Sequence, residues 1–237
     1  MSAVRLAAAR VLVLGVGGLG CPAAAALAAA GVGRLHLVDD DVVELSNLQR
    51  QILFRSDQLG RPKAEAARDN LLRRWPMLQI EAAARRLEGA ELRAQLADVD
   101  VVLDCTDNIA SRHALNQVCR DTGRPWVSAA AVGWQGQILV LDPRRGDLPC
   151  YRCAFPFDAL PAGSCVTQGV IGPLLGVLGA MQALQALRLL VDGVSPLSGR
   201  LLRYDALRGS WRSYALARDP HCPVCGSAEQ PSASVLM

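Results

Sequence analysis

Lysine is nearly absent from this sequence of 237 residues, because arginine supplies every basic side chain except Lys63. A lysine kept where arginine is used everywhere else suggests a site that a guanidinium cannot fill. Lysine is a compact point charge on a flexible stem, which suits it to reach a phosphate in a confined pocket. The alternative is chance survival of one lysine. Lys63 therefore gains a role only if the rest of the sequence supplies such a pocket.

The sequence also has few features of nucleic-acid-binding, exported or membrane proteins. Its net charge is only +3, and the arginines are spread along the chain without a basic tail. The apolar run at residues 11–14 resembles an export signal, but four glycines interrupt residues 15–20. Residues 169–187 carry no charge and are long enough to span a bilayer, yet Pro173 and Gln182 favour a helix buried against a sheet or a subunit partner. We therefore expect a cytoplasmic protein without nucleic-acid or membrane partners.

Hydrophobic residues make up 51% of the chain, enough to bury a core, and α/β chains of this length commonly form one domain. Periodicity predicts alternating strands and helices, and hence a Rossmann-like, doubly wound, mostly parallel sheet. The expected strands are residues 11–16, 34–39, 78–84, 99–105 and 126–131, and the expected helices are residues 19–30, 62–75, 88–97 and 109–121.

The pattern changes after Gly133. A strand is expected at residues 137–141, then an irregular stretch, the long apolar helix, and two strands at residues 200–205 and 211–215. A short turn through Arg208 and Gly209 would join these last two strands as an antiparallel hairpin. We expect a single domain over residues 1–237, with a nucleotide-binding half at residues 10–133 and a second half at residues 134–226.

A glycine-rich motif, GVGGLG, lies between the first predicted strand and the first predicted helix. Glycines allow a tight turn and close approach to phosphate, and the helix N-terminus offers free N–H groups. Asp39 ends the second strand, where it can accept hydrogen bonds from a ribose. A dinucleotide such as NAD is the usual ligand of this arrangement, and a tight turn without a ligand is the alternative. The motif glycines are Gly15, Gly17, Gly18 and Gly20.

Polar side chains crowd the segment after the second predicted strand, with Lys63 a short way on. Donors of this kind beside a nucleotide would bind a triphosphate tail; a solvated polar loop is the alternative. The cluster comprises Asp39, Asp40, Asp41, Ser46, Asn47, Gln49 and Arg50.

Three more polar residues come after the fourth predicted strand, at the edge of a parallel sheet where ligands bind. They are Asp104, Asp107 and Asn108. Asp107 could hold a magnesium ion, because Mg²⁺ prefers a carboxylate together with waters and phosphate oxygens. The alternative role for Asp107 is to cap the helix expected from Ile109.

Two Cys-x-x-Cys pairs give the strongest signal by spacing alone. The pairs are Cys150 with Cys153 and Cys222 with Cys225, and 68 residues separate them. Four thiolates in two such pairs predict a closed, structural zinc site. Disulfides are the alternative, and they fit poorly with a chain that lacks a convincing export signal.

The other cysteines and the histidines give weaker signals. Cys165 precedes the long apolar helix, where a helix N-terminus can lower a thiol's pKa and make it nucleophilic; an incidental loop cysteine is the alternative. The remaining cysteines are Cys21, Cys105 and Cys119, which we expect to pack as small hydrophobic residues. The three histidines form no ligand or triad pattern.

Several of these segments together resemble the ThiF/MoeB/HesA family, the bacterial relatives of ubiquitin-activating enzymes. They are GVGGLGCPAA, VDDDVVELSNLQRQILF, LGRPKAEAA, VLDCTDN, CYRC, SCVTQGVIGPLLGVLGAMQALQALRLL, YDAL and CPVCG, and they span residues 11–226. Enzymes of this family use ATP and Mg²⁺ to adenylylate the C-terminal glycine of a ubiquitin-fold sulfur carrier, ThiS-like or MoaD-like. The products are pyrophosphate and an acyl-adenylate, and the acyl-adenylate then receives sulfur for thiamine or molybdopterin type biosynthesis.

The resemblance implies roles for the candidate residues. Gly18 and Asp39 would contact the nucleotide, and residues 46–50 with Lys63 would contact its phosphates. Asp107 and Asn108 would hold the metal and the reacting groups. The implied catalytic residues are Arg50, Lys63, Asp107 and, in the relatives that link covalently to their carrier, the match of Cys165.

The resemblance also implies partners. These are a carrier protein ending in Gly-Gly, a sulfur donor such as a cysteine desulfurase or a rhodanese-like protein, and a second copy of the chain. Carrier and zinc binding would fall in the half at residues 134–226.

One departure from the family concerns the N-terminal arm. Family members usually begin with a helical arm bearing an RYxRQ-like motif, whose arginine reaches the neighbouring subunit's site. Arg5 or Arg10 could substitute, but neither lies in such a motif, and we hypothesise either a misassigned start codon or a form that needs a partner chain. A non-catalytic carrier-binding subunit is therefore one alternative function. An NAD-dependent oxidoreductase is a second, although it leaves Lys63 and the cysteine pairs without a role.

Overall fold

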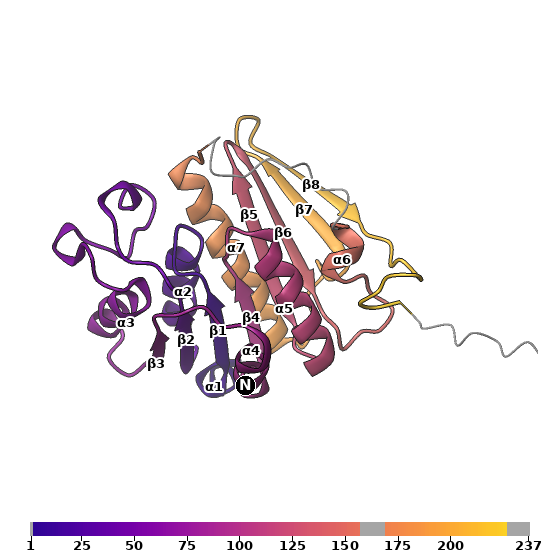
Figure 1. The fold of residues 1–237 in the computed structure, drawn as a ribbon, viewed down its shortest axis with the longest axis horizontal. Helices are drawn as coiled ribbons and strands as arrows, with labels where there is room; N and C mark the ends of the chain where they lie inside the picture. The colour runs from indigo at the N-terminus through magenta and orange to yellow at the C-terminus, as the bar shows by residue number, and fades with distance from the viewer. Residues whose placement is uncertain (1, 157–168, 227–237) are drawn as a thin grey trace, which may run out of the picture.

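A computed structural model describes residues 2–156 and 169–226, and its centre is one eight-stranded sheet in the order β3-β2-β1-β4-β5-β6-β7-β8 (Figure 1). The first five strands are β1 (Arg10–Leu14), β2 (Arg34–Val38), β3 (Gln79–Ala83), β4 (Val101–Asp104) and β5 (Trp126–Val132). The last three are β6 (Gln135–Leu141), β7 (Arg200–Asp205) and β8 (Ser210–Ala215).

The sheet is parallel from β3 to β5 and antiparallel from β5 to β8. The strand order reverses between β1 and β4, which places a topological switch point, the usual ligand edge of such sheets, at their carboxyl ends. The predicted mostly parallel sheet with antiparallel C-terminal strands is therefore confirmed. The predicted hairpin joins β7 to β8 through Gly209, which has a positive φ of 61° that suits glycine.

Helices cover both faces of the sheet. On one face, an apolar core forms under α2 (Gly20–Ala29), α3 (Lys63–Arg74) and α7 (Gly172–Val191). On the other face, a second core forms under α4 (Gly89–Ala97), α5 (Ile109–Thr122) and the short α6 (Tyr151–Ala154). Two 3₁₀ turns, η1 (Leu45–Asn47) and η2 (Ser56–Gln58), lie between β2 and α3.

Helix α7 is the long apolar segment that could pass for a membrane span by length and composition, but half of its most apolar stretch is buried within the fold. It packs on α2 and on β4, β5 and β6. Its buried Gln182 donates from Nε2 to the carbonyl oxygens of Asp104 and Val127, at 2.8 and 3.0 Å. These bonds fix the helix to the sheet, and they explain one of the two buried glutamines of this apolar helix.

Helix α1 (Ser2–Ala8) was not predicted from the sequence. It lies at the amino end of β1, and Arg5 donates from Nη1 to the carbonyl oxygen of Val191 at the end of α7, at 2.6 Å. Arg10 pairs with Asp98 at 2.6 Å. Both arginines are therefore engaged within the chain, at the amino ends of the strands and away from the glycine-rich motif, which does not favour either of them as a substitute for the arm.

Candidate functional site

The glycine-rich motif turns from the end of β1 into α2, and its first residue needs to be glycine. Gly15 has a φ of 85°, and a Cβ atom there would lie 2.7 Å from the carbonyl oxygen of Cys105, the residue after β4. The motif therefore packs directly against the end of β4. This contact brings the two predicted ligand-binding segments together.

The other motif glycines differ in what they allow. A Cβ atom on Gly20 would lie 2.0 Å from the carbonyl oxygen of Gly15, and one on Gly18 would lie 2.4 Å from Cδ1 of Leu175 in α7. A Cβ atom on Gly17 would meet only Nε2 of Gln51, at an ordinary 3.5 Å. Packing thus explains why glycine stands at positions 18 and 20. At position 17 the packing would admit a side chain, so packing does not explain Gly17.

Asp39 lies buried beyond the end of β2, and its carboxylate holds the glycine-rich turn. Its Oδ2 accepts from the N–H of Val16 at 2.6 Å, and its Oδ1 accepts from the N–H of Asp41 at 2.9 Å. Burial raises the pKa of this carboxyl group, and the two backbone N–H groups oppose that rise. Asp39 is therefore a fixed acceptor at the centre of the predicted nucleotide site.

Lys63, the single lysine, is the first residue of α3 and is almost fully buried. Its Nζ atom forms an ion pair with Oδ2 of Asp41 at 2.7 Å, and its side chain is 5% exposed whereas that of Asp41 is 70% exposed. The Lys63 backbone N–H also donates to the carbonyl oxygen of Asp41, at 2.9 Å. The pair therefore lies at the mouth of the site, with the ammonium inside and the carboxylate facing solvent.

The polar segment after β2 contains the compact turn η1, although Asp40, Asp41, Ser46 and Gln49 are exposed. Asn47 is buried and donates from Nδ2 to Oγ of Ser46 at 2.9 Å, and its Oδ1 accepts from Nε2 of Gln51 at 2.9 Å. Oε1 of Gln51 is buried and has no hydrogen-bond partner among the described residues. Gln51 thus presents an unused acceptor beside Gly17, and we did not select it from the sequence. Its position within the same polar run was the available signal.

Gln49 and Arg50 face a different neighbour. They line a pocket of about 190 Å³ with Ile52 and the first turn of α7, which includes Pro173. Arg50 donates from Nη1 to the carbonyl oxygen of Ser46 at 3.0 Å. No bond joins Arg50 to Lys63 within the described residues, so the structure places these two predicted cations in one region without direct contact.

Asp107 and Asn108 come after β4, as predicted, but the residue that caps the next helix is Asn108 and not Asp107. Asn108 is the N-cap of α5, and its Oδ1 accepts from the N–H of Ser111 at 2.8 Å. Asp107 is exposed and does not cap the helix, so the capping alternative for Asp107 is wrong. Its carboxylate is left available at the ligand edge.

Asp104, the last residue of β4, stabilises this edge through hydrogen bonds. It is buried, and its carboxylate accepts from Oγ of Ser128 at 2.6 Å and from Oγ1 of Thr106 at 2.6 Å. The buried guanidinium of Arg112 lies 3.4 Å from the same carboxylate and also donates from Nη2 to the carbonyl oxygen of Thr106, at 2.5 Å. This network fixes the segment from which Asp107 projects.

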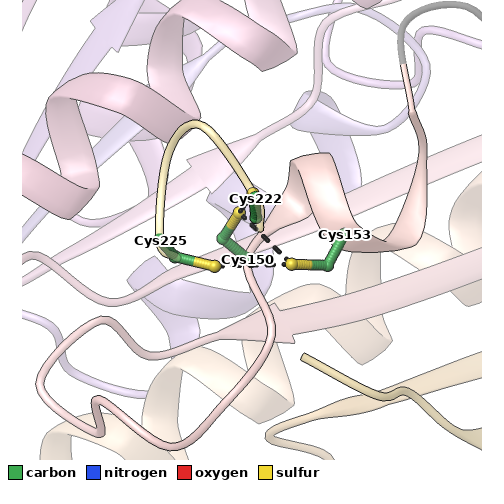
Figure 2. A group of neighbouring side chains, drawn as sticks. All are labelled: Cys150, Cys153, Cys222 and Cys225. Carbon is green, nitrogen blue, oxygen red and sulfur yellow. Dashed lines mark hydrogen bonds between the residues drawn. The ribbon is translucent and has the colours of Figure 1, made fainter. Parts of the chain in front are cut away.

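The four paired cysteines converge into one cluster (Figure 2). The Sγ atoms of Cys150 and Cys153 are 3.9 Å apart, those of Cys150 and Cys222 are 3.7 Å apart, and those of Cys153 and Cys225 are 3.4 Å apart. None of them forms a disulfide. The cluster joins α6 to the segment after β8, and its four sulfurs could hold one metal ion.

Asn116 on α5 adjoins this cluster and is 2% exposed. Its Oδ1 accepts from the N–H of Tyr151, inside the first cysteine pair, at 2.9 Å. Burial raises the pKa of the Cys150 thiol, and the amide of Asn116 is close enough to oppose that rise. Nδ2 of Asn116 nevertheless has no hydrogen bond of ordinary geometry among the described residues. A buried donor of this kind fits a thiolate better than a protonated thiol.

Of the remaining cysteines, three lie in the described residues, and they form no site there. Cys165 lies outside the described residues. Cys21, Cys105 and Cys119 are buried, as predicted, and burial raises the pKa of each thiol, to about 12 for Cys21. These three thiols are therefore poor nucleophiles.

Comparison with known proteins gives close relatives over nearly the whole chain. The chain is 46% identical over 219 residues to the sulfur carrier protein ThiS adenylyltransferase of Escherichia coli, and the match covers 92% of this chain and 86% of that protein. It is 47% identical over 217 residues to the molybdopterin-synthase adenylyltransferase of E. coli, covering 92% of this chain and 87% of that protein.

The fold also has solved counterparts. The structure of E. coli MccB with MccA-N7isoASN superposes with a TM-score of 0.84 at 24% identity, covering 95% of this chain and 69% of that one. This likeness concerns the fold alone. Residues 2–224 match the ThiF family, and with the relatives above this match shows that the chain belongs to the ThiF family.

Proposed function

We propose that this protein is an adenylyltransferase that uses ATP and Mg²⁺ to activate the C-terminal glycine of a ubiquitin-fold sulfur carrier. The observation that carries the proposal is the connected set of Val16, Asp39, Asp41 and Lys63, which places a buried ammonium beside a glycine-rich turn. The names of the two E. coli relatives support the same chemistry. Sulfur would then reach the activated carrier from a separate donor.

The residues of this site would hold the nucleotide. Asp39 would receive ribose hydroxyls in addition to its backbone bonds, and the open backbone of Gly17 would receive phosphate. The unused Oε1 of Gln51 offers a further acceptor. The polar residues of the turn, which include Ser46, Asn47 and Gln49, and Asn108 at the start of α5 complete the proposed nucleotide site with Arg50.

The chemical step joins two anions, a carboxylate and an α-phosphate, so the enzyme has to align them and neutralise the developing charge. Lys63 would give up its pairing with Asp41 and turn to the phosphates, and Arg50 would add a second cation. Asp107 would hold Mg²⁺ at the ligand edge, where the ion would neutralise phosphate oxygens. Cys165 remains a candidate for a covalent link to the carrier.

We propose that the cysteine cluster holds a structural zinc ion. Four thiolates at about 2.3 Å from a tetrahedral zinc have their sulfurs about 3.8 Å apart. The three sulfur–sulfur separations in the structure, 3.4, 3.7 and 3.9 Å, bracket that value. The unpaired Nδ2 of Asn116 would donate to the Cys150 thiolate. With all four positions filled by cysteine, the ion would tie β8 to the middle of the chain and take no part in the reaction.

The remaining partners belong to the same proposal. Residues 134–226 would bind the carrier and the zinc, and residues 10–133 would bind the nucleotide. A cysteine desulfurase or a rhodanese-like protein would supply sulfur, and two copies of the chain would assemble as a homodimer in the cytoplasm.

Exchange of labelled pyrophosphate into ATP tests the proposal. The purified protein is expected to catalyse exchange only when a ThiS-like or MoaD-like carrier with an intact Gly-Gly end is present. A carrier lacking its last glycine is the matched control. Carrier binding without exchange would identify a non-catalytic subunit, and the absence of both would remove the proposal.

A further inference from the structure

Two arginines of the β7–β8 hairpin stand apart from all the others. Every arginine of the chain lies in the described residues, and within that part of the chain all but two donate a hydrogen bond, form an ion pair, lie over a ring or make another polar contact. The two exceptions are Arg203 on β7 and Arg212 on β8, both exposed. They are direct cross-strand partners.

Like charges directly opposite each other destabilise a strand pair. The nearest carboxylate on this strand, Asp205, is already engaged, because its Oδ1 accepts from the N–H groups of Leu207 and Arg208 in the hairpin turn. Nothing described in the chain therefore neutralises the two guanidinium groups. A negatively charged partner would.

The sheet places the two arginines in a row that leads toward the proposed active site. Arg203 also pairs with Gln137 on β6, and Gln137 pairs with Ala130 on β5. The strand alternation puts this row on the α5 side of the sheet, beyond the part that α5 and α6 cover, because Leu139 and Leu201 on the same side belong to that core. Figure 1 shows the β7–β8 hairpin at the edge of the sheet, with its turn toward the top of the view.

The distance along this row suits a small protein whose tail enters the site. Strands lie about 4.8 Å apart, so Arg203 is about 14 Å and Arg212 about 19 Å from β4, which leads into Asp107. Four or five extended residues cover about 14–18 Å. Tyr214 also projects from the same face and is 44% exposed, and tyrosine and arginine are enriched in protein interfaces.

We propose that Arg203 and Arg212 form an acid-binding surface that docks the body of the carrier protein while its C-terminal tail extends to the active site. This inference rests on the proposed function and adds the chemistry by which the partner is recognised: a carboxylate pair on the carrier's folded domain. Because the surface lies away from the reacting groups, it sets carrier affinity and not the rate of the chemical step.

The test uses the double variant Arg203→Glu/Arg212→Glu and the ThiS-like or MoaD-like carrier of the exchange assay. Its matched control is Arg73→Glu/Arg74→Glu, which makes the same charge change on the exposed part of α3, at the far end of the sheet. Fluorescence anisotropy measures carrier binding without ATP at low and high salt, and pyrophosphate exchange gives KM for the carrier, KM for ATP and kcat.

We expect the hairpin variant to raise the carrier Kd and KM by about 10-fold or more, and to weaken the salt dependence of binding. Its kcat at saturating carrier and its KM for ATP should stay at wild-type values, and the control should match wild type throughout. Lysine substitution of a surface carboxylate on the carrier should restore binding to the glutamate variant. The milder Arg203→Gln/Arg212→Gln variant should show a smaller effect, and it serves if the glutamate variant misfolds.

The surface and the proposed function fail separately. Unchanged carrier affinity in both hairpin variants, with normal exchange by wild type, would overturn the surface alone. Arginine-dependent carrier binding without exchange would overturn the function and keep the surface, and no carrier binding at all would overturn both. The proposal of a protein partner would also be overturned if these arginines were needed for binding a 20-nucleotide RNA or phosphatidylserine vesicles but not for binding the carrier.

Discussion

Alanine substitution at two neighbouring glycines should separate folding from nucleotide binding. At Gly20, a new Cβ atom would lie 2.0 Å from the carbonyl oxygen of Gly15, and a backbone atom cannot swing aside as a side chain can. Overpacking of this kind costs about 1–3 kcal/mol. For a chain of this size each kcal/mol lowers Tm by about 2–4 °C, so Gly20→Ala should lower Tm by about 2–12 °C.

At Gly17, the same change meets only Nε2 of Gln51 at 3.5 Å, an ordinary contact. Gly17→Ala should therefore change stability by less than about 0.5 kcal/mol. The added methyl group would stand where phosphate approaches the backbone, and losing one hydrogen bond to a charged group costs about 1.5–3 kcal/mol, or roughly 10–100-fold in ATP affinity.

Differential scanning fluorimetry and calorimetric titration with ATP measure the two effects on the same samples. The reasoning would be refuted by a Gly17→Ala protein that binds ATP as wild type does. It would equally be refuted by a Gly20→Ala protein with an unchanged Tm.

Three further predictions concern other parts of the molecule. Asn116→Asp keeps the acceptor for Tyr151 but removes the Nδ2 donor, so it should lower zinc affinity by about 10–100-fold in a chelator competition. The same change at the exposed neighbour, Gln117→Glu, should leave zinc affinity unchanged, and equal affinities of the two variants would exclude Nδ2 as a donor to the thiolate. Asn108→Ala should lower the free energy of unfolding by about 0.5–2 kcal/mol through loss of the α5 cap. Asp107→Ala should leave Tm unchanged while slowing pyrophosphate exchange. A lower Tm in Asp107→Ala and an unchanged Tm in Asn108→Ala would contradict these roles. Burial lowers the pKa of His36, partly opposed by Glu81 and Gln95, so the unfolded state takes up more protons on acidification and stability should fall from about pH 7 to pH 5. His36→Gln should flatten that part of the Tm profile, and a profile identical to that of the wild type would refute this interpretation.

The features that depend on local pattern could be predicted from the sequence. Runs such as residues 101–104 are buried on both sides and read as strands, and the Cys-x-x-Cys spacing forces each pair of thiols together. The glycine-rich turn and Asp39 also match a known arrangement of strand, turn and helix.

Features that depend on long-range register could not be predicted. The partner of Lys63 is Asp41, 22 residues earlier, and only the fold shows which of three neighbouring aspartates takes the ammonium. The cap of α5 is a different case, because the helix begins at Ile109 as expected, and the residue directly before it, Asn108, is therefore the cap. Asn116 meets the cysteine cluster only through packing of α5 on α6, and Arg203 faces Arg212 only through the hairpin register.

The central claim concerns the buried ammonium of Lys63, and pyrophosphate exchange by Lys63 variants tests it most directly. Loss of one preorganised charge-stabilising group typically costs about 10²–10³-fold in kcat. We expect a loss of that order in Lys63→Ala and Lys63→Arg proteins that retain wild-type Tm and metal content. Carrier-dependent exchange at the wild-type rate in a folded Lys63→Ala protein would contradict the account.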